Sequence, residues 1–154
     1  MINESLFYFR NPTDFSTFIE KLNIYNDWKI GKGTMNTRGE SIRNKGYTRY
    51  LRDRFNNKNM FRRSVSISEI VSWLDSFVIM KRLFDKLREN IERTEFDEIE
   101  LYCEYVIKLS KNMRVDFVIR YKKIILIIEF RMVNNFSKIK TTWNKKKLEL
   151  LVYK

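Results

Sequence analysis

The feature that most constrains the fold is a change in hydrophobic spacing between residues 91 and 99. From Ser66 to Ile91, apolar residues recur every three to four positions, and Ser66 with Glu69 forms an S-x-x-E capping box at the start of this run. From Ile99 to Leu109, apolar and polar residues alternate, which is the pattern of a strand. The sequence therefore predicts a long core helix followed by a sheet, in an α+β or α/β layer fold.

Two further strands are expected after this one, over Arg114–Arg120 and Ile124–Met132, joined by a turn at residues 122 and 123. The second is apolar on both faces until Glu129, which is typical of a central strand covered on both sides. Amphipathic spacing then predicts a final helix over Phe136–Tyr153. We expect a three-stranded mixed or antiparallel sheet with a central β-hairpin, preceded by helices and followed by one helix.

The 154 residues suit a single domain over positions 1–154, with a basic helical N-terminal region (1–65) and a core (66–154). Asn11 and Pro12 indicate the start of one N-terminal helix, and Tyr47 and Leu51 belong to a second, shorter one. The stretch Met1–Arg10 lacks the pattern of a secretory leader, and the longest apolar run is too short to cross a membrane. We expect a cytoplasmic protein without a membrane partner.

Charge is concentrated in one segment. The chain has 31 Lys and Arg against 19 Asp and Glu, and Lys29–Arg63 holds eleven basic residues against only Glu40 and Asp53. Such an excess favours a polyanionic partner, most simply nucleic acid. An AT-rich coding bias is an alternative explanation for the lysines, although it explains the 14 arginines less well. The candidate contacts to nucleic acid are Lys32, Arg38, Arg43, Lys45, Arg49, Arg52 and Arg54.

The composition also restricts the chemistry. Histidine is absent, which excludes Ser-His-Asp and Cys-His catalysis and most zinc sites. The single cysteine, Cys103, allows no internal disulfide. Any reaction must therefore use carboxylates, Lys, Arg and hydroxyl groups.

The candidate site lies on the predicted hairpin. If the turn is centred between residues 122 and 123, Asp116 lies directly opposite Glu129, and Glu129 shares a face with Arg131. Two carboxylates that face each other favour either a shared proton or a bound cation, and a divalent ion could then activate water for phosphodiester hydrolysis. The alternative is that both acids are ordinary strand-end residues paired with nearby arginines.

The run from Arg114 to Ile119, followed by Ile125–Ile128 and the triplet Glu129-Phe130-Arg131, resembles the signature of the PD-(D/E)xK nuclease superfamily. The resemblance spans about Ser66–Lys154. It implies a restriction-endonuclease-like or Holliday-junction-resolvase-like core, and hydrolysis of DNA with Mg²⁺ or Mn²⁺. Asp116, Glu129 and the Phe130 carbonyl would be the metal ligands.

The chain departs from that family at three points. Arg131 stands where the family has lysine, and arginine can hold a phosphate but cannot give up a proton as a base. Lys147 is a candidate substitute on the last helix, with snorkelling to solvent as the alternative. Glu69 and Glu40 are the candidates for the additional acid that the family has on a helix. Glu69 has a capping role as the alternative. Glu40 follows Gly39 and could reach a metal from a flexible segment, with simple loop solvation as the alternative. The family usually continues with further strands, whereas this sequence stops at Lys154. Two alternatives are open: either the sheet has only three strands, or the chain is a shortened version of a longer protein.

Three functions follow as hypotheses. The first is a metal-dependent endonuclease or exonuclease, acting on DNA rather than RNA. The second is a catalytically inactive nuclease-fold module that binds nucleic acid. The third is a basic protein-interaction subunit, for example in a homodimer, that uses the acidic stretch Glu92–Glu104, in which Glu100 and Glu104 are expected to face solvent or the basic segment.

Overall fold

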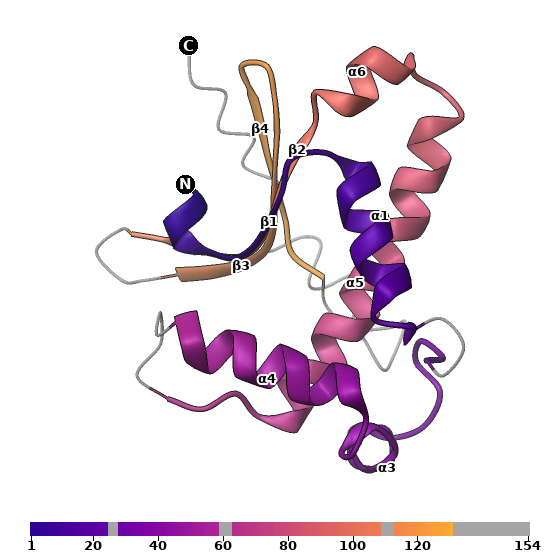
Figure 1. Ribbon diagram of the computed structural model, residues 1–154, viewed down its shortest axis with the longest axis vertical. Helices are drawn as coiled ribbons and strands as arrows, with labels where there is room; N and C mark the ends of the chain where they lie inside the picture. Colours follow the sequence, from indigo (N-terminus) through magenta and orange to yellow (C-terminus); the bar gives the residue numbers. More distant parts are fainter. Residues whose placement is uncertain (25–27, 59–62, 109–112, 131–154) are drawn as a thin grey trace, which may run out of the picture.

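A computed structural model describes residues 1–24, 28–58, 63–108 and 113–130 of the chain. The elements in chain order are η1 (Ile2–Glu4), β1 (Ser5–Phe9), α1 (Pro12–Lys21), α3 (Met35–Ile42), α4 (Gly46–Lys58), α5 (Ile67–Arg88), α6 (Arg93–Asp97), β2 (Glu100–Ile107), β3 (Met113–Tyr121) and β4 (Ile124–Ile128). Figure 1 shows α1 and α5 side by side along one side of the sheet, with α3 and α4 gathered at one end. The fold is α+β.

The sheet has four antiparallel strands in the order β1-β2-β3-β4, one more than expected. The extra strand is β1, a five-residue run rich in aromatic side chains, which are well suited to a pleated surface. It pairs with β2, and Phe7 lies opposite Cys103. The first residues of the chain therefore join the same sheet as its second half.

Helix α5 covers the inner face of this sheet. It begins where the sequence predicts, because the Ser66 hydroxyl accepts a hydrogen bond from the Glu69 amide (3.2 Å) and the Glu69 carboxylate accepts one from the Ser66 amide (3.1 Å). Phe77 is buried on its apolar face, with its ring 5.9 Å from that of Phe7 and 6.2 Å from that of Phe117. These aromatic contacts fix the helix against β1 and β3.

Both predicted N-terminal helices are present. In α1, the Asn11 side chain accepts a hydrogen bond from the Asp14 amide (2.8 Å), and Phe15 and Ile19 are fully buried. Helix α4 buries three residues of its apolar face, Tyr47, Leu51 and Phe55. The short helices α3 and α6 were not expected, because neither carries a strong amphipathic pattern.

The expectation of a central, doubly covered second strand is wrong for the described part of the chain. There, β4 ends the strand order and pairs with β3 alone. The four residues from Ile124 to Ile127 are between 38% and 63% exposed. A run of apolar residues has the same sequence pattern at a sheet edge as in the middle, so the sequence could not separate the two. The predicted helix over Phe136–Tyr153 lies outside the described residues.

Candidate active site

The β3–β4 hairpin has the register that the sequence predicts. The pairs are Phe117–Ile128, Val118–Ile127, Ile119–Leu126, Arg120–Ile125 and Tyr121–Ile124, closed by a turn at Lys122 and Lys123. Continued by one residue, this register brings Glu129, the first residue after β4, opposite Asp116 on β3. The two acids therefore occupy neighbouring positions on adjacent chain segments.

A direct contact holds the chain in place just beyond β4. The Phe130 backbone amide donates a hydrogen bond to Asp116 Oδ2 (2.6 Å). The Phe130 ring packs edge-on against that of Phe117, with 5.8 Å between the ring centroids. Glu129 directly precedes Phe130, and its side chain is exposed. Asp116 is half-buried, so the pair lies at the boundary between core and solvent.

A third carboxylate, Glu104, lies in the same row. The β2–β3 pairs on either side of it, Cys103 with Phe117 and Tyr105 with Val115, set a register that brings Glu104 opposite Asp116. Only 2% of Glu104 is exposed, so the expectation that it faces solvent is wrong. Its backbone is left-handed (φ 52°), which interrupts the simple alternation on which that expectation was based.

Burial dominates the electrostatics of Glu104. Desolvation raises the pKa of its carboxyl group to about 8, against the opposing effects of the Arg114 charge and a hydrogen bond from Trp73. The nearby Asp116 charge adds to the increase. Arg114 Nε nevertheless lies 2.9 Å from Glu104 Oε2. Glu104 is thus a largely protonated acid at neutral pH, next to the candidate pair.

Arg114 connects this row to helix α5. Its Nη1 donates to Glu69 Oε1 (2.9 Å), and Arg63 binds the same carboxylate through two hydrogen bonds of 2.8 and 2.7 Å. Burial acts to raise the pKa of Glu69, but hydrogen bonds from Arg63, the Ser66 backbone and Arg114 lower it to about 2. Glu69 therefore completes the capping box of α5 and is the shared partner of two arginines.

The remaining candidate acid, Glu40, lies on α3 rather than in a loop. It is exposed, and Arg43 Nε donates to its Oε2 (3.0 Å). This hydrogen bond lowers the pKa of Glu40. The contact is local to α3 and does not involve the hairpin.

The basic segment divides into surface and core residues. Lys32, Arg43, Lys45, Arg49 and Arg54 are exposed and Arg52 is half-buried. Arg38 is different: it is 6% exposed, its guanidinium pairs with Asp75 on α5, and it lies 4.6 Å from the centre of the Trp28 ring. Arg38 is therefore a core residue and is not available to contact nucleic acid.

Within the described ranges, Arg49 and Arg52 on α4 make no ion pair. Tyr50, between them in sequence, is 47% exposed. This face of α4 offers two uncompensated guanidinium groups beside an accessible aromatic ring. Arg131 and Lys147 lie outside the described residues.

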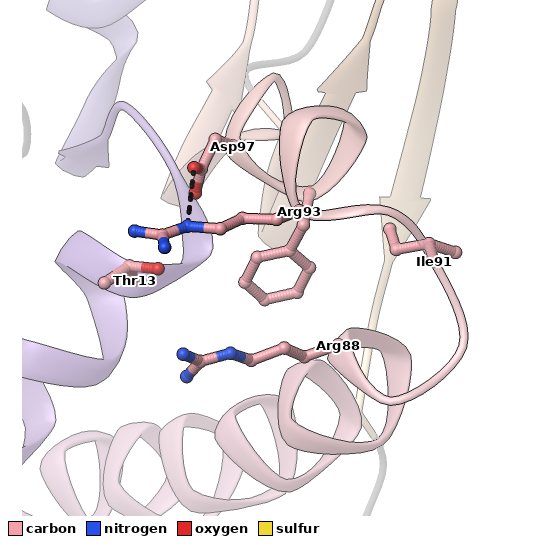
Figure 2. Close-up of a pocket in the computed structure, with 6 residues that line it drawn as sticks. Thr13, Arg88, Ile91, Arg93 and Asp97 are labelled. Atoms are coloured by element: carbon pink, nitrogen blue, oxygen red, sulfur yellow. Dashed lines mark ion pairs between the residues drawn. The ribbon is translucent and has the colours of Figure 1, made fainter.

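A pocket of about 210 Å³ is found elsewhere, lined by Thr13, Arg88, Ile91, Arg93, Phe96 and Asp97. Figure 2 shows Arg88 and Arg93 extending in parallel toward α1, with Arg93 Nε 3.8 Å from Asp97 Oδ2. Helix α5, roughly 30 Å long at 1.5 Å per residue, separates this pocket from the end that carries Glu69. The pocket is smaller than the roughly 300–1,000 Å³ of typical ligand sites and is not part of the candidate site.

No protein-family model matches this chain, and no curated protein or solved structure matches it. Among the described residues, no three His, Cys, Asp or Glu side chains are grouped so that they could hold a metal ion. In the same residues, no helix combines the length and apolar character needed to cross a membrane.

Proposed function

We propose that the chain is a nuclease of the PD-(D/E)xK type that hydrolyses phosphodiester bonds, in DNA rather than RNA, with Mg²⁺ or Mn²⁺. The observation that carries this proposal is the hairpin register, which aligns Asp116 with Glu129 at the end of an otherwise apolar strand. The hydrogen bond from the Phe130 amide to Asp116 supports it further, because it holds the two segments together.

The residues fit a hard divalent cation. Magnesium is commonly bound in proteins by one or two carboxylates, with waters and substrate phosphates completing its shell, so a cluster of three acids is not required. Asp116, Glu129 and the Phe130 carbonyl are the ligands we propose. A bound ion would lower the pKa of a water molecule and offset charge on the phosphate. Arg131 would hold the scissile phosphate, with Lys147 as the additional cation.

The exposed face of α4 is the proposed nucleic-acid contact. Arg49 and Arg52 have no acidic partner in the described part of the chain, and the exposed Lys45 lies directly before the helix. Guanidinium and ammonium groups bind phosphates and release counterions, whereas the exposed Tyr50 ring offers a surface on which a base can stack.

An inactive nuclease-fold module that binds nucleic acid is the second candidate. Arg131 favours it, because arginine cannot act as the proton acceptor that a lysine can be. The third candidate, a protein-interaction subunit using the acidic stretch, has less support. Lys122 lies 3.9 Å from Glu95 and 3.7 Å from Glu98, so part of that acidic charge is neutralised within the chain.

The test is cleavage of supercoiled plasmid and single-stranded DNA with Mg²⁺, Mn²⁺ or EDTA. Asp116→Asn and Glu129→Gln should each abolish metal-dependent cleavage. Glu95→Gln, which removes an exposed acid outside the site, is the matched control and should cleave like the wild type. Cleavage that persists in both site variants would refute the proposal, and binding without cleavage would favour the inactive module.

A further inference from the structure

Strand β4 exposes an unusual surface. Its residues Ile124, Ile125, Leu126 and Ile127 are all apolar and all at least 38% exposed, and successive side chains on a strand point to opposite faces. Natural proteins commonly protect such an edge with charges, proline or a bulge, because it can pair with another strand. The described part of β4 has none of these, since it is the unbroken run I-I-L-I-I.

The hairpin geometry defines which backbone groups of β4 remain for a new partner. Tyr121 and Ile124 flank a two-residue turn and are therefore expected to bond to each other. Because the bonding direction alternates along an antiparallel strand, Leu126 and Ile128 also face β3. The amides and carbonyls of Ile125 and Ile127 then point to the outer edge.

Charge complementarity favours a second copy of β4 as the partner strand, paired in one particular register. If a second copy of β4 pairs antiparallel with the first about a two-fold axis at Leu126, Ile125 lies opposite the partner's Ile127. The same register brings Lys123 opposite the partner's Glu129, which gives two oppositely charged pairs per interface. Lys123 makes no ion pair within the described residues, whereas its neighbour Lys122 forms ion pairs with Glu95 and Glu98.

We propose that two copies of the chain pair through β4 about an axis at Leu126, and that each copy contributes Lys123 to the Asp116–Glu129 site of the other. Opposed residues of an antiparallel pair share a face, so the partner's Lys123 lies in the same row as Glu129 and Asp116. This gives the site a lysine, which the chain's own triplet Glu129-Phe130-Arg131 lacks. The role of Lys123 rests on the proposed nuclease function, whereas the dimer does not.

The dimer should be reversible. An edge of five residues buries far less than the roughly 1,200–2,000 Å² of a typical stable interface, so dissociation on dilution is expected. Light scattering after gel filtration should show a twofold rise in mass with concentration. Ile125→Lys should keep the protein monomeric, whereas Leu83→Lys, at a 47% exposed residue of α5, should leave the dimer intact.

Cysteine cross-linking tests the register itself. At a non-hydrogen-bonded antiparallel pair the Cα atoms are about 4.5 Å apart, within the range for a disulfide, so oxidised Leu126→Cys should run as a covalent dimer. In the same register the two copies of Ile124→Cys are four residues apart along the strand, roughly 13 Å, and should not cross-link. The native Cys103 does not compete, because it is fully buried and burial raises the pKa of its thiol.

Equal cross-linking at both positions, or none at either, would overturn the proposed pairing. A wild-type protein that stays monomeric at every concentration would do the same. Circular dichroism of each variant shows whether it has kept the fold, and exposed positions on β4 and α5 are chosen for that reason.

Mixing two inactive variants tests the role of Lys123. Lys123→Ala should lose roughly a hundredfold in cleavage, and Asp116→Asn should be inactive. In an equal mixture the heterodimer has one complete site, so about a quarter of wild-type activity should return. No recovery by variants that still dimerise would overturn the role of Lys123. If Leu126→Cys cross-links and the wild type does not cleave, the nuclease function and this role of Lys123 are refuted, and the dimer stands.

Discussion

Glu104 should make the stability of the protein fall as the pH rises, and Glu104→Gln should remove that dependence. The carboxyl group is protonated below pH 4.5 in both the folded and the unfolded chain. Between pH 4.5 and about 8, the unfolded chain loses this proton while the folded protein retains it, because burial raises the folded pKa to about 8. Unfolding is therefore favoured increasingly across this window, and the effect levels off above it.

The size of the effect follows from the shift. A difference from 4.5 to about 8, at 1.36 kcal/mol per pKa unit, corresponds to a loss of about 5 kcal/mol in the free energy of unfolding. The charges that act on Glu104 come from β3 (Arg114 and Asp116), from α5 (Glu69) and from Arg63, which lies just before α5. Domains of this size have a total free energy of unfolding of about 5–15 kcal/mol, so this loss should be large enough to measure easily.

Urea denaturation from pH 4.5 to 9 in EDTA, followed by tryptophan fluorescence, provides the assay. Since the chain has no histidine, the usual source of titration in this range is missing. Glu104→Gln should be close to the wild type at pH 4.5 and more stable at pH 9, whereas Glu100→Gln, a half-buried acid on the same strand, should retain the wild-type slope. A wild-type stability that does not fall with pH, or an equal fall in Glu104→Gln, would refute the reasoning.

Three further predictions follow from single interactions. Asp75→Ala removes the carboxylate that pairs with buried Arg38 and should cost about 3–5 kcal/mol in a urea titration; a change within error would mean that the pair is not buried in solution. Ser66→Ala removes the cap of α5 and should cost about 1 kcal/mol by the same method, with the control Ser68→Ala close to neutral. Replacing both Arg49 and Arg52 by Gln should weaken DNA binding. It should also reduce the slope of log K against log salt concentration by about 0.9 for each phosphate that is no longer neutralised. The control Arg82→Gln on α5 should leave this slope unchanged, and an unchanged slope in the double variant would exclude α4 as the DNA-binding surface.

Local signals in the sequence were enough to predict most elements of the described fold. The capping box at Ser66 and Glu69 gave the start of α5, and Asn11 gave that of α1, because both signals depend on residues within one turn. The hairpin register could also be predicted, since a two-residue turn determines every pair that follows it. These features need no knowledge of distant contacts.

The parts that sequence reasoning missed depend on long-range packing. Strand β1 forms by pairing with β2, which lies more than ninety residues away in the chain. Arg38 carries the same charge as its exposed neighbours, but it is buried because the Asp75 carboxylate on α5 pairs with it and the Trp28 ring lies against its guanidinium. Glu104 became an interior acid through a left-handed backbone conformation that no local residue pattern indicates. Its position opposite Asp116 could have been found only by extending the register of the hairpin to the preceding strand.

The central claim is that Asp116 and Glu129 together bind a divalent cation, and a Mn²⁺ titration followed by electron paramagnetic resonance tests it most directly. The account predicts that Mn²⁺ binds the wild type, that Mg²⁺ displaces it, and that Asp116→Asn and Glu129→Gln each lose the site while Glu95→Gln retains it. Wild-type protein that binds no Mn²⁺ with or without DNA, or site variants that bind it as the wild type does, would contradict the claim.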